Sequence, residues 1–221
     1  MMNTKILAAM IVASCVLAQP VTGQAIGVAA RAGTLGLGAE AALGLGDRLV
    51  VRGGLGLMPL EIDGTVDDIA VTFELPRTWS NVGLDIYLTD VVRIGGGFLF
   101  KPDDVTLTAT PTTAQDIGGQ QFTPEQIGTL VGSLDSGGRA PYALIGFGKH
   151  TSSGIGLSLD IGAAFFEETR VTLDSSGGTL SGDPDFQDRL EAEARDFEED
   201  LPTYIDLWPI LNLGLRIGLG R

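Results

Sequence analysis

Charged side chains recur at alternate positions within segments that are otherwise apolar or rich in glycine. In a β-strand such alternation places the charges on one face, because successive side chains point to opposite sides. The residues predicted to share this inner face are Glu40, Arg52, Asp85, Arg93, Asp160, Asn212 and Arg216. Glycines recur on the same face, so the charges are expected to fill a narrow, enclosed lumen.

Hairpin geometry predicts which of these charges meet. Glu40 and Arg52 lie about equally far from a short turn, and Asp85 and Arg93 flank the next one. Opposed charges in a narrow lumen lose their hydration, so pairing matters more there than at a surface. We therefore expect paired charges that plug the lumen. The alternative is a path for protons or small ions through the same residues.

The strands that must position these residues are predicted from alternating apolar positions joined by short turns. One further strand results if the long segment 21–46 is divided near Gly33, and another strand ends the chain. The predicted hairpins pair 35–46 with 49–60, 82–88 with 91–101, and 140–149 with 155–166, before the final strand 205–219. The count is eight strands.

The final strand carries the clearest pattern. Its apolar face is uninterrupted and consists of Ile205, Leu207, Pro209, Leu211, Leu213, Leu215, Ile217 and Leu219. Polar and small residues form its other face, which is the arrangement that a lipid-facing barrel strand needs. The set Asn212, Gly214, Ile217 and Leu219 also resembles the carboxy-terminal assembly signal of bacterial outer-membrane barrels. That resemblance implies the barrel-assembly machinery as a partner, although the chain ends on Gly220 and Arg221 where the family usually ends on an aromatic residue.

The predicted fold class is an all-β, antiparallel transmembrane up-and-down β-barrel of eight strands that occupies residues 21–221. Eight strands enclose just enough room for side chains or one small ligand, which disfavours a general diffusion pore. The segments 61–69, 111–138 and 174–202 are predicted as long extracellular loops, opposite short periplasmic turns.

Residues 1–18 are predicted to be a secretory signal peptide. Lys5 precedes an apolar run from Ile6 to Ala18, which is too short for a transmembrane helix. Cleavage is expected after Ala18 or after Ala25. The alternative is that Cys15 lies in a lipobox and is lipidated.

Two helices are expected within the loops. Thr123, Pro124 and Gln126 form a capping-box pattern that predicts a helix near 124–131. A second helix is predicted near 184–201, with Phe186, Leu190 and Phe197 on an apolar stripe that rests on the barrel rim. Its other face carries Asp185, Asp188, Glu191, Glu193, Asp196, Glu198, Glu199 and Asp200. This acidic lid is expected to bind Ca²⁺ or Mg²⁺ only weakly and nonspecifically, or to dock a partner.

Composition limits the classes of partner. The net charge of −14 argues against nucleic acid, because phosphate contacts need clustered Lys and Arg. No spacing indicates a dedicated metal site, a phosphate loop or a cofactor. Outer-membrane lipid and lipopolysaccharide are the expected surroundings of a barrel of this kind.

An enzyme is the remaining class to weigh. His150 and Ser152 form a His-x-Ser pair that resembles the motif of outer-membrane lipid A deacylases. No acidic residue follows at that family's spacing, where Ala164 stands, and the predicted topology places the pair at a periplasmic turn. We therefore expect no catalytic residues and interpret His150 as a turn residue.

The mature chain resembles a group of small, uncharacterised Gram-negative outer-membrane proteins. Three segments carry this resemblance, namely 32–38, 140–148 and 160–162, together with the acidic helix that leads into Trp208 and Pro209. The resemblance implies a fold and a location in the outer membrane, and no activity. The leading hypothesis is a structural or surface-interaction barrel, and the alternatives are a narrow conduit and a lipid-modifying enzyme.

Overall fold

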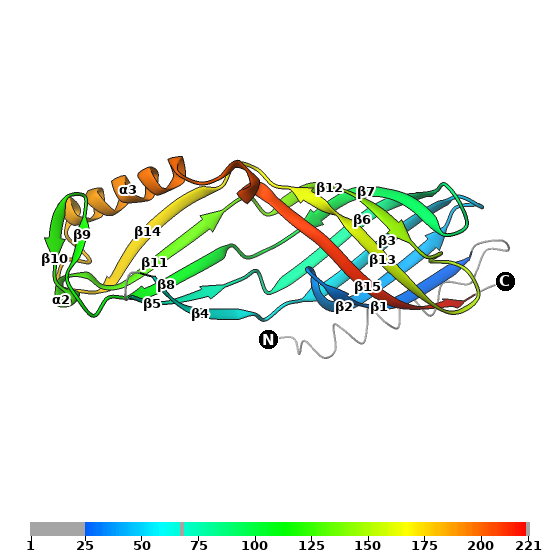
Figure 1. Cartoon of the computed structure of the whole chain (residues 1–221), viewed down its shortest axis with the longest axis horizontal. Coiled ribbons are helices and arrows are strands. Elements are labelled where there is room, and N and C mark those ends of the chain that lie inside the picture. The colour runs from blue at the N-terminus through cyan, green and yellow to red at the C-terminus, as the bar shows by residue number, and fades with distance from the viewer. Residues whose placement is uncertain (1–24, 67–68, 220–221) are drawn as a thin grey trace.

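A computed structural model describes residues 25–66 and 69–219, and it shows a closed eight-stranded barrel that continues at one end into a smaller sheet (Figure 1). All neighbouring barrel strands are antiparallel, in the order β1-β15-β13-β12-β7-β6-β3-β2. The barrel strands are β1 (Ile26–Gly33), β2 (Gly36–Gly44), β3 (Leu49–Leu57), β6 (Thr78–Tyr87), β7 (Val92–Phe100), β12 (Arg139–Phe147), β13 (Gly154–Phe165) and β15 (Leu207–Leu219).

The predicted strand count and the three predicted hairpins are confirmed. The division near Gly33 is a tight turn into β2, where Gly36 has a φ of 79°, a conformation that suits glycine. β15 closes the barrel by pairing with β1 on one side and β13 on the other. Its predicted first residues, Ile205 and Asp206, belong instead to a 3₁₀ turn, η1 (Thr203–Asp206).

The outer surface of the barrel is apolar. Along β15, the outward residues are exposed and the inward residues are buried, as the alternation predicts. Leu213 is 56% exposed, whereas its inward neighbour Asn212 is 5% exposed. Every other barrel strand adds exposed Leu, Ile, Val, Phe or Ala side chains to the same surface. These exposed side chains therefore form an apolar belt around the barrel.

The prediction of long loops at 61–69, 111–138 and 174–202 is wrong in part, because much of this sequence forms strands. Five barrel strands are followed or preceded by a second strand, and these form a sheet in the order β14-β11-β8-β5-β4. This extension consists of β4 (Glu61–Val66), β5 (Ile69–Glu74), β8 (Val105–Thr110), β11 (Gly128–Asp135) and β14 (Arg170–Gly177). Most of their side chains are only half-buried, so their hydrophobic alternation is weak in the sequence.

The far end of the extension carries a short hairpin, β9 (Gln115–Ile117) and β10 (Gln120–Phe122), and a single helical turn, α2 (Pro124–Ile127). The Thr123 N–H donates to the Gln126 side chain at 2.9 Å, as the capping-box pattern predicts. The carboxylate of Glu125 accepts hydrogen bonds from the backbone N–H of Glu125 itself and from the Thr123 hydroxyl. These two contacts, the backbone one being the larger, lower the pKa of Glu125. The expected helix to 131 is too long, because Gly128, with a φ of 71°, ends α2 and starts β11.

The second predicted helix is α3 (Pro184–Glu199), and Asp183 caps it by accepting a hydrogen bond from the Phe186 N–H. Its expected position on the barrel rim is wrong. α3 lies along β14 and reaches β9, so it covers the extension (Figure 1). Phe186 and Leu190 are buried against Ile117, Phe122 and Ile127, as the stripe predicts. Phe197, however, is 56% exposed and does not hold the helix down.

None of the helices within the described residues has the length and the hydropathy that crossing a membrane as a helix would require.

Candidate functional site in the barrel lumen

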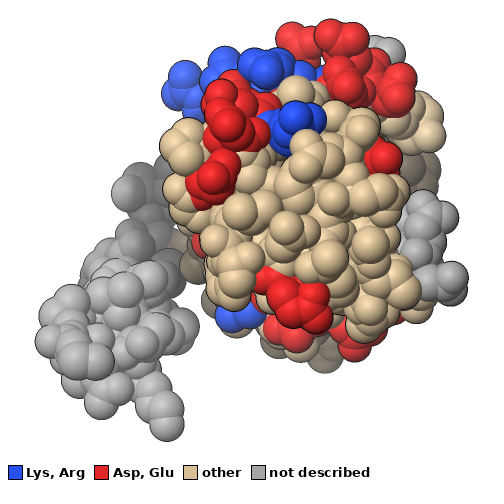
Figure 2. Space-filling model, turned by 90° about the vertical axis from the view of Figure 1, so that its left-hand side faces the viewer, with Lys and Arg blue, Asp and Glu red and all other residues tan. Residues whose placement is uncertain are grey.

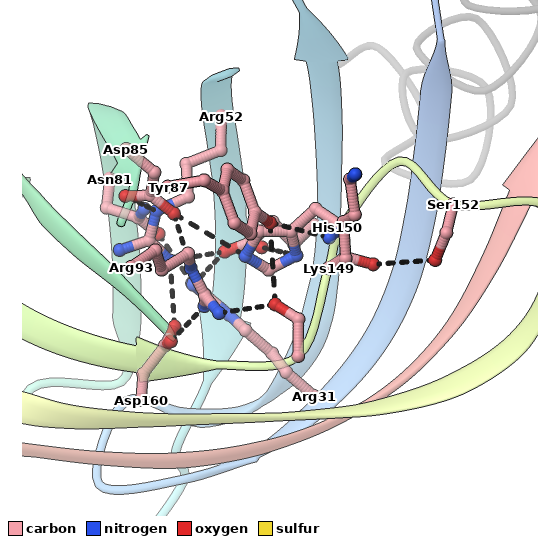
Figure 3. A network of polar contacts seen from close by, with 12 residues as sticks. Arg31, Arg52, Asn81, Asp85, Tyr87, Arg93, Lys149, His150, Ser152 and Asp160 are labelled. Atoms are coloured by element: carbon pink, nitrogen blue, oxygen red, sulfur yellow. Dashed lines mark hydrogen bonds and ion pairs between the residues drawn. The ribbon is translucent and has the colours of Figure 1, made fainter. Parts of the chain in front are cut away.

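Three layers of side chains fill the barrel from its short turns to the extension. Beside the turns lies a small apolar cluster of Ala42, Val50 and Tyr87. A charged network, which we call the lumen network, occupies the middle (Figure 3). Beyond it an aromatic layer closes the end next to the extension. Side chains thus close the lumen at three levels along its length.

Arg52, on β3, lies at the centre of the lumen network. Its guanidinium donates to Glu40 at 3.1 Å, to Asp85 at 3.1 Å and to Asp160 at 2.8 Å, and these acids come from three other strands. Its side chain is 2% exposed. The predicted pairing of Glu40 with Arg52 is confirmed, and it is one contact of three.

Arg93, on β7, links the same acids from the opposite side. It donates to Asp85 at 2.7 Å and also to Asp160. The predicted pairing of Asp85 with Arg93 is therefore confirmed. Because each of the two aspartates is shared by Arg52 and Arg93, the four side chains form a closed ring of buried ion pairs.

Arg31, on β1, is a member of the lumen network that the sequence reasoning missed. Its Nη1 donates to Asn81 at 2.7 Å and contacts Glu40 at 3.5 Å, and the residue is 5% exposed. The alternation of β1 does indicate that Arg31 faces inward. Arg31 is an even number of positions from Gly27 and Gly33, whereas Val28 and Ala30 occupy the outward positions. Uncertainty over where β1 begins concealed it.

His150 is the largest correction to the expected site. It was interpreted as a residue of a polar turn, yet it is 2% exposed, because the segment 148–153 folds back into the barrel. Its imidazole nitrogens lie 3.6 Å from a Glu40 oxygen and 3.5 Å from an Asp85 oxygen. Its backbone N–H donates to the Tyr87 hydroxyl at 2.7 Å. The histidine thus completes the lumen network from the turn side (Figure 3).

The remaining predicted members, Asn212 and Arg216, do not join the carboxylates. Arg216 donates to the backbone oxygen of Ser152 at 2.7 Å and to its hydroxyl at 2.6 Å, so it fastens the inserted segment. Asn212 is buried with its Oδ1 unpartnered. Both side chains point inward as predicted, but neither forms an ion pair or a hydrogen bond with a carboxylate. Of the other assembly-signal residues, Gly214 also faces inward, whereas Ile217 and Leu219 face outward.

Glycines make room for the charged side chains. A Cβ at Gly95 would overlap the Asp85 carboxylate, and one at Gly146 would overlap the Arg93 guanidinium. A Cβ at Gly156 would likewise overlap the Arg216 guanidinium. In a barrel this narrow, a long polar side chain fits only where the facing residue has no side chain. The glycines of the inner face are therefore required by packing against the network.

The aromatic layer closes the barrel at the end next to the extension. Trp79 packs against Trp208 with ring centroids 4.5 Å apart and against Phe166 at 6.3 Å. Leu35, Leu99, Leu144 and Ile210 surround them. The Trp208 indole N–H donates to the Thr34 backbone oxygen at 3.2 Å, which ties the layer to the turn between β1 and β2.

The acids of α3 lie outside the barrel, and several have local partners. Glu198 accepts from the Val171 N–H at 2.8 Å, Glu193 accepts from the Gly118 N–H at 3.2 Å, and Glu191 pairs with Arg195 at 3.0 Å. Among the described residues, no group of three or more His, Cys, Asp or Glu side chains has a metal-binding arrangement.

No known protein-family model and no curated protein sequence matches this chain. Similar folds occur among solved structures. Acinetobacter baumannii CarO2 has 17% identity and a TM-score of 0.59, with 88% of this chain and 98% of that chain covered. Acinetobacter baumannii CarO has 19% identity and a TM-score of 0.51, with 86% and 96% covered. A major outer membrane protein from Thermus thermophilus has 15% identity and a TM-score of 0.43, with 89% and 100% covered.

At these identities the comparison establishes the fold, for which the two CarO structures are the evidence. The chain is an antiparallel, eight-stranded closed β-barrel, and it shares this fold with the two CarO structures. The resemblance inferred from the sequence is confirmed at this level.

Proposed function

We propose that this protein is an outer-membrane β-barrel of a Gram-negative bacterium with a closed lumen, and that it presents the extension for interactions at the cell surface. The observation that carries the proposal is the apolar belt around a barrel whose interior is charged. Most of its strands have 9 to 13 residues, enough to cross a bilayer. A water-exposed barrel would place its polar face outside.

The filled lumen favours a structural role over a conduit. A permeating ion would have to displace the aromatic layer, then the lumen network, then the inserted segment around His150. The buried ion pairs are satisfied mainly by one another, so opening such a path would strand charges at low dielectric. Conduction therefore remains only the alternative function.

The extension supports the surface role. Its strands continue five barrel strands, so it is held rigidly to the barrel and projects well beyond the rim (Figure 1). Figure 2 shows its far end as a broad surface largely without charge, with acidic and some basic side chains at the margins. The exposed residues 118–121 of the β9–β10 hairpin lie at this end. Such a surface suits a neutral polar partner, whereas the surrounding acids suit only weak Ca²⁺ or Mg²⁺ binding next to lipopolysaccharide.

We propose no enzymatic activity. Lipid A deacylation would need Ser152 to be activated by His150, but the Ser152 hydroxyl is bound by Arg216 and the imidazole faces Glu40 and Asp85. Both residues lie in the inserted segment, inside the barrel rather than at its lipid-facing surface. A His150→Ala variant should show no change in the lipid A acylation pattern of the cells that produce it.

The first test of the proposal is location and orientation. An epitope inserted after Gly182, in the exposed segment before α3, should be labelled on intact cells. The matched control carries the same epitope between Asp47 and Arg48, in a short turn, and should be labelled only after the outer membrane is permeabilised. The opposite pattern would invert the topology, and recovery of the protein in the soluble fraction would refute the membrane location.

The second test is the state of the lumen. The detergent-purified protein should migrate differently on a gel before and after boiling, because closed barrels resist detergent unfolding. The same preparation should give no steady conductance in planar bilayers. Large, stable conductance steps from heat-modifiable protein would refute the closed lumen while leaving the membrane location intact.

A further inference from the structure

A small cavity separates the lumen network from the aromatic layer. Its volume is about 10 Å³, the room that one water-sized particle needs. Its polar lining consists of Arg31, Arg52, Asn81, Tyr142, Asp160 and Asn212, and apolar residues of the aromatic layer form the other side. The cavity is thus bounded by residues from most barrel strands.

Buried polar atoms on the residues that line this cavity have no partner within the protein. They are the Nε and Nη2 of Arg31, the hydroxyl of Tyr142 and the Oδ1 of Asn212. Each of the three residues is 5% exposed. Guanidinium and phenol groups are donors, and leaving such groups unsatisfied in a buried site is costly. The lining therefore offers unpartnered donors at Arg31 and Tyr142, next to the amide group of Asn212.

The charges of the lumen do not balance. The buried, charged side chains on the strands of the barrel comprise four arginines, Arg31, Arg52, Arg93 and Arg216, and three acids, Glu40, Asp85 and Asp160. Lys101, which follows the end of β7, is also buried, but it has its own partner in Asp104 at 2.8 Å. The excess is one positive charge.

Two of these arginines have little countercharge. Arg216 donates only to Ser152 and contacts no carboxylate, and Arg31, which lines the cavity, is the second. Its single carboxylate contact is Glu40 at 3.5 Å, and the same Glu40 oxygen lies closer to Arg52, at 3.1 Å. Asp160 also lines the cavity, but both of its oxygens already accept from arginines. A buried guanidinium with so little countercharge needs another anion nearby.

We propose that the cavity binds one small monovalent anion of halide size, held by Arg31 and the Tyr142 hydroxyl, with the Asn212 amide turned to donate. An anion there supplies the missing countercharge and satisfies the unpartnered donors together. The cavity volume excludes carboxylates, phosphate and other polyatomic anions. The Asn212 orientation follows because its two amide atoms can exchange places by rotation. This site is independent of where the protein resides and of what the extension binds.

The direct test is a crystal structure of the unmodified, detergent-folded protein grown in sodium bromide. An anomalous difference peak within about 3.5 Å of the Arg31 Nε is expected, since hydrogen bonds to a large anion exceed the usual N–H···O distance. A water molecule at this position, with no anomalous signal in bromide, would overturn the proposal.

The second test measures the midpoint of heat-induced unfolding on gels in sodium bromide and in sodium gluconate of equal concentration. Gluconate is too large for the cavity, so bromide alone should raise the midpoint of the unmodified protein. Arg31→Gln should weaken the apparent bromide affinity at least tenfold. The matched control is Arg77→Gln, which removes an exposed arginine of the extension and should keep the full bromide effect. Equal midpoints in the two salts would refute the site.

Discussion

Arg52→Met provides the most stringent test of the lumen network, because methionine retains much of the length of the side chain and removes its charge. The variant loses contacts with Glu40, Asp85 and Asp160 at once. Asp85 and Asp160 would still be held by Arg93, whereas Glu40 would retain one long arginine contact, with Arg31 at 3.5 Å, and the His150 imidazole at 3.6 Å. Removing one partner of a buried ion pair typically costs about 3–5 kcal/mol. We expect a loss of about 4 kcal/mol in the free energy of unfolding, most of it from the stranded Glu40.

The origin of that loss can be separated with a double-mutant cycle. Glu40→Gln in the Arg52→Met background removes the stranded charge. The double variant should therefore be more stable than the sum of the single losses predicts, by about 2 kcal/mol, within the range found for residues in one network. Unfolding in urea can be followed in lipid vesicles through the fluorescence of Trp79 and Trp208, which lie in the aromatic layer next to the network.

Arg77→Met is the control for this measurement. Arg77 contacts two acids of the extension at 3.5 Å and 3.1 Å, but its side chain is 60% exposed. Exposed ion pairs contribute about 0–1 kcal/mol, so this variant should lose no more than that. If Arg52→Met costs no more than Arg77→Met, or if the cycle is additive, the lumen acids are not buried together and the reasoning fails.

Two further predictions concern packing. Gly83→Ala should destabilise the barrel by about 1–3 kcal/mol in the same urea assay, because the new Cβ would overlap the Tyr142 hydroxyl and approach a backbone oxygen. The control is Gly182→Ala, which should be nearly neutral, because a Cβ there meets nothing within 4 Å. Phe186→Ala should cost the extension about 3 kcal/mol, seen as faster hydrogen exchange in β14, whereas the half-exposed Phe197→Ala should cost less than about 1 kcal/mol. Similar effects of Phe186→Ala and Phe197→Ala would show that α3 does not pack through the predicted stripe.

The sequence alone determined the barrel strands after β1 and the face that each of them presents. Period-two alternation assigns every residue of a strand to one side, and a shift of one residue would exchange the two faces. Short turns fix the register of each hairpin, which is why the pairs Glu40–Arg52 and Asp85–Arg93 could be predicted. The uninterrupted apolar face of β15 likewise required an apolar surrounding.

The extension could not be predicted in this way. Its strands are half-buried and rich in Thr and Ser, so their alternation is too weak to distinguish them from loops. The position of α3 could not be predicted for the same reason. The apolar stripe shows that the helix packs against something, but it does not show that the partner is the sheet of the extension. Only the presence of a sheet beyond the rim decides that Phe186 and Leu190 are buried there and that Phe197 is not.

Tertiary structure also decided how the lumen is completed. Nothing local in the segment 148–153 shows that it turns back into the barrel, because its insertion depends on Tyr87 and Arg216, which belong to distant strands. The meeting of Arg31 with Asn81 likewise crosses 50 positions of the chain. Alternation determines which side chains face the lumen, but closure of the barrel determines which of them touch.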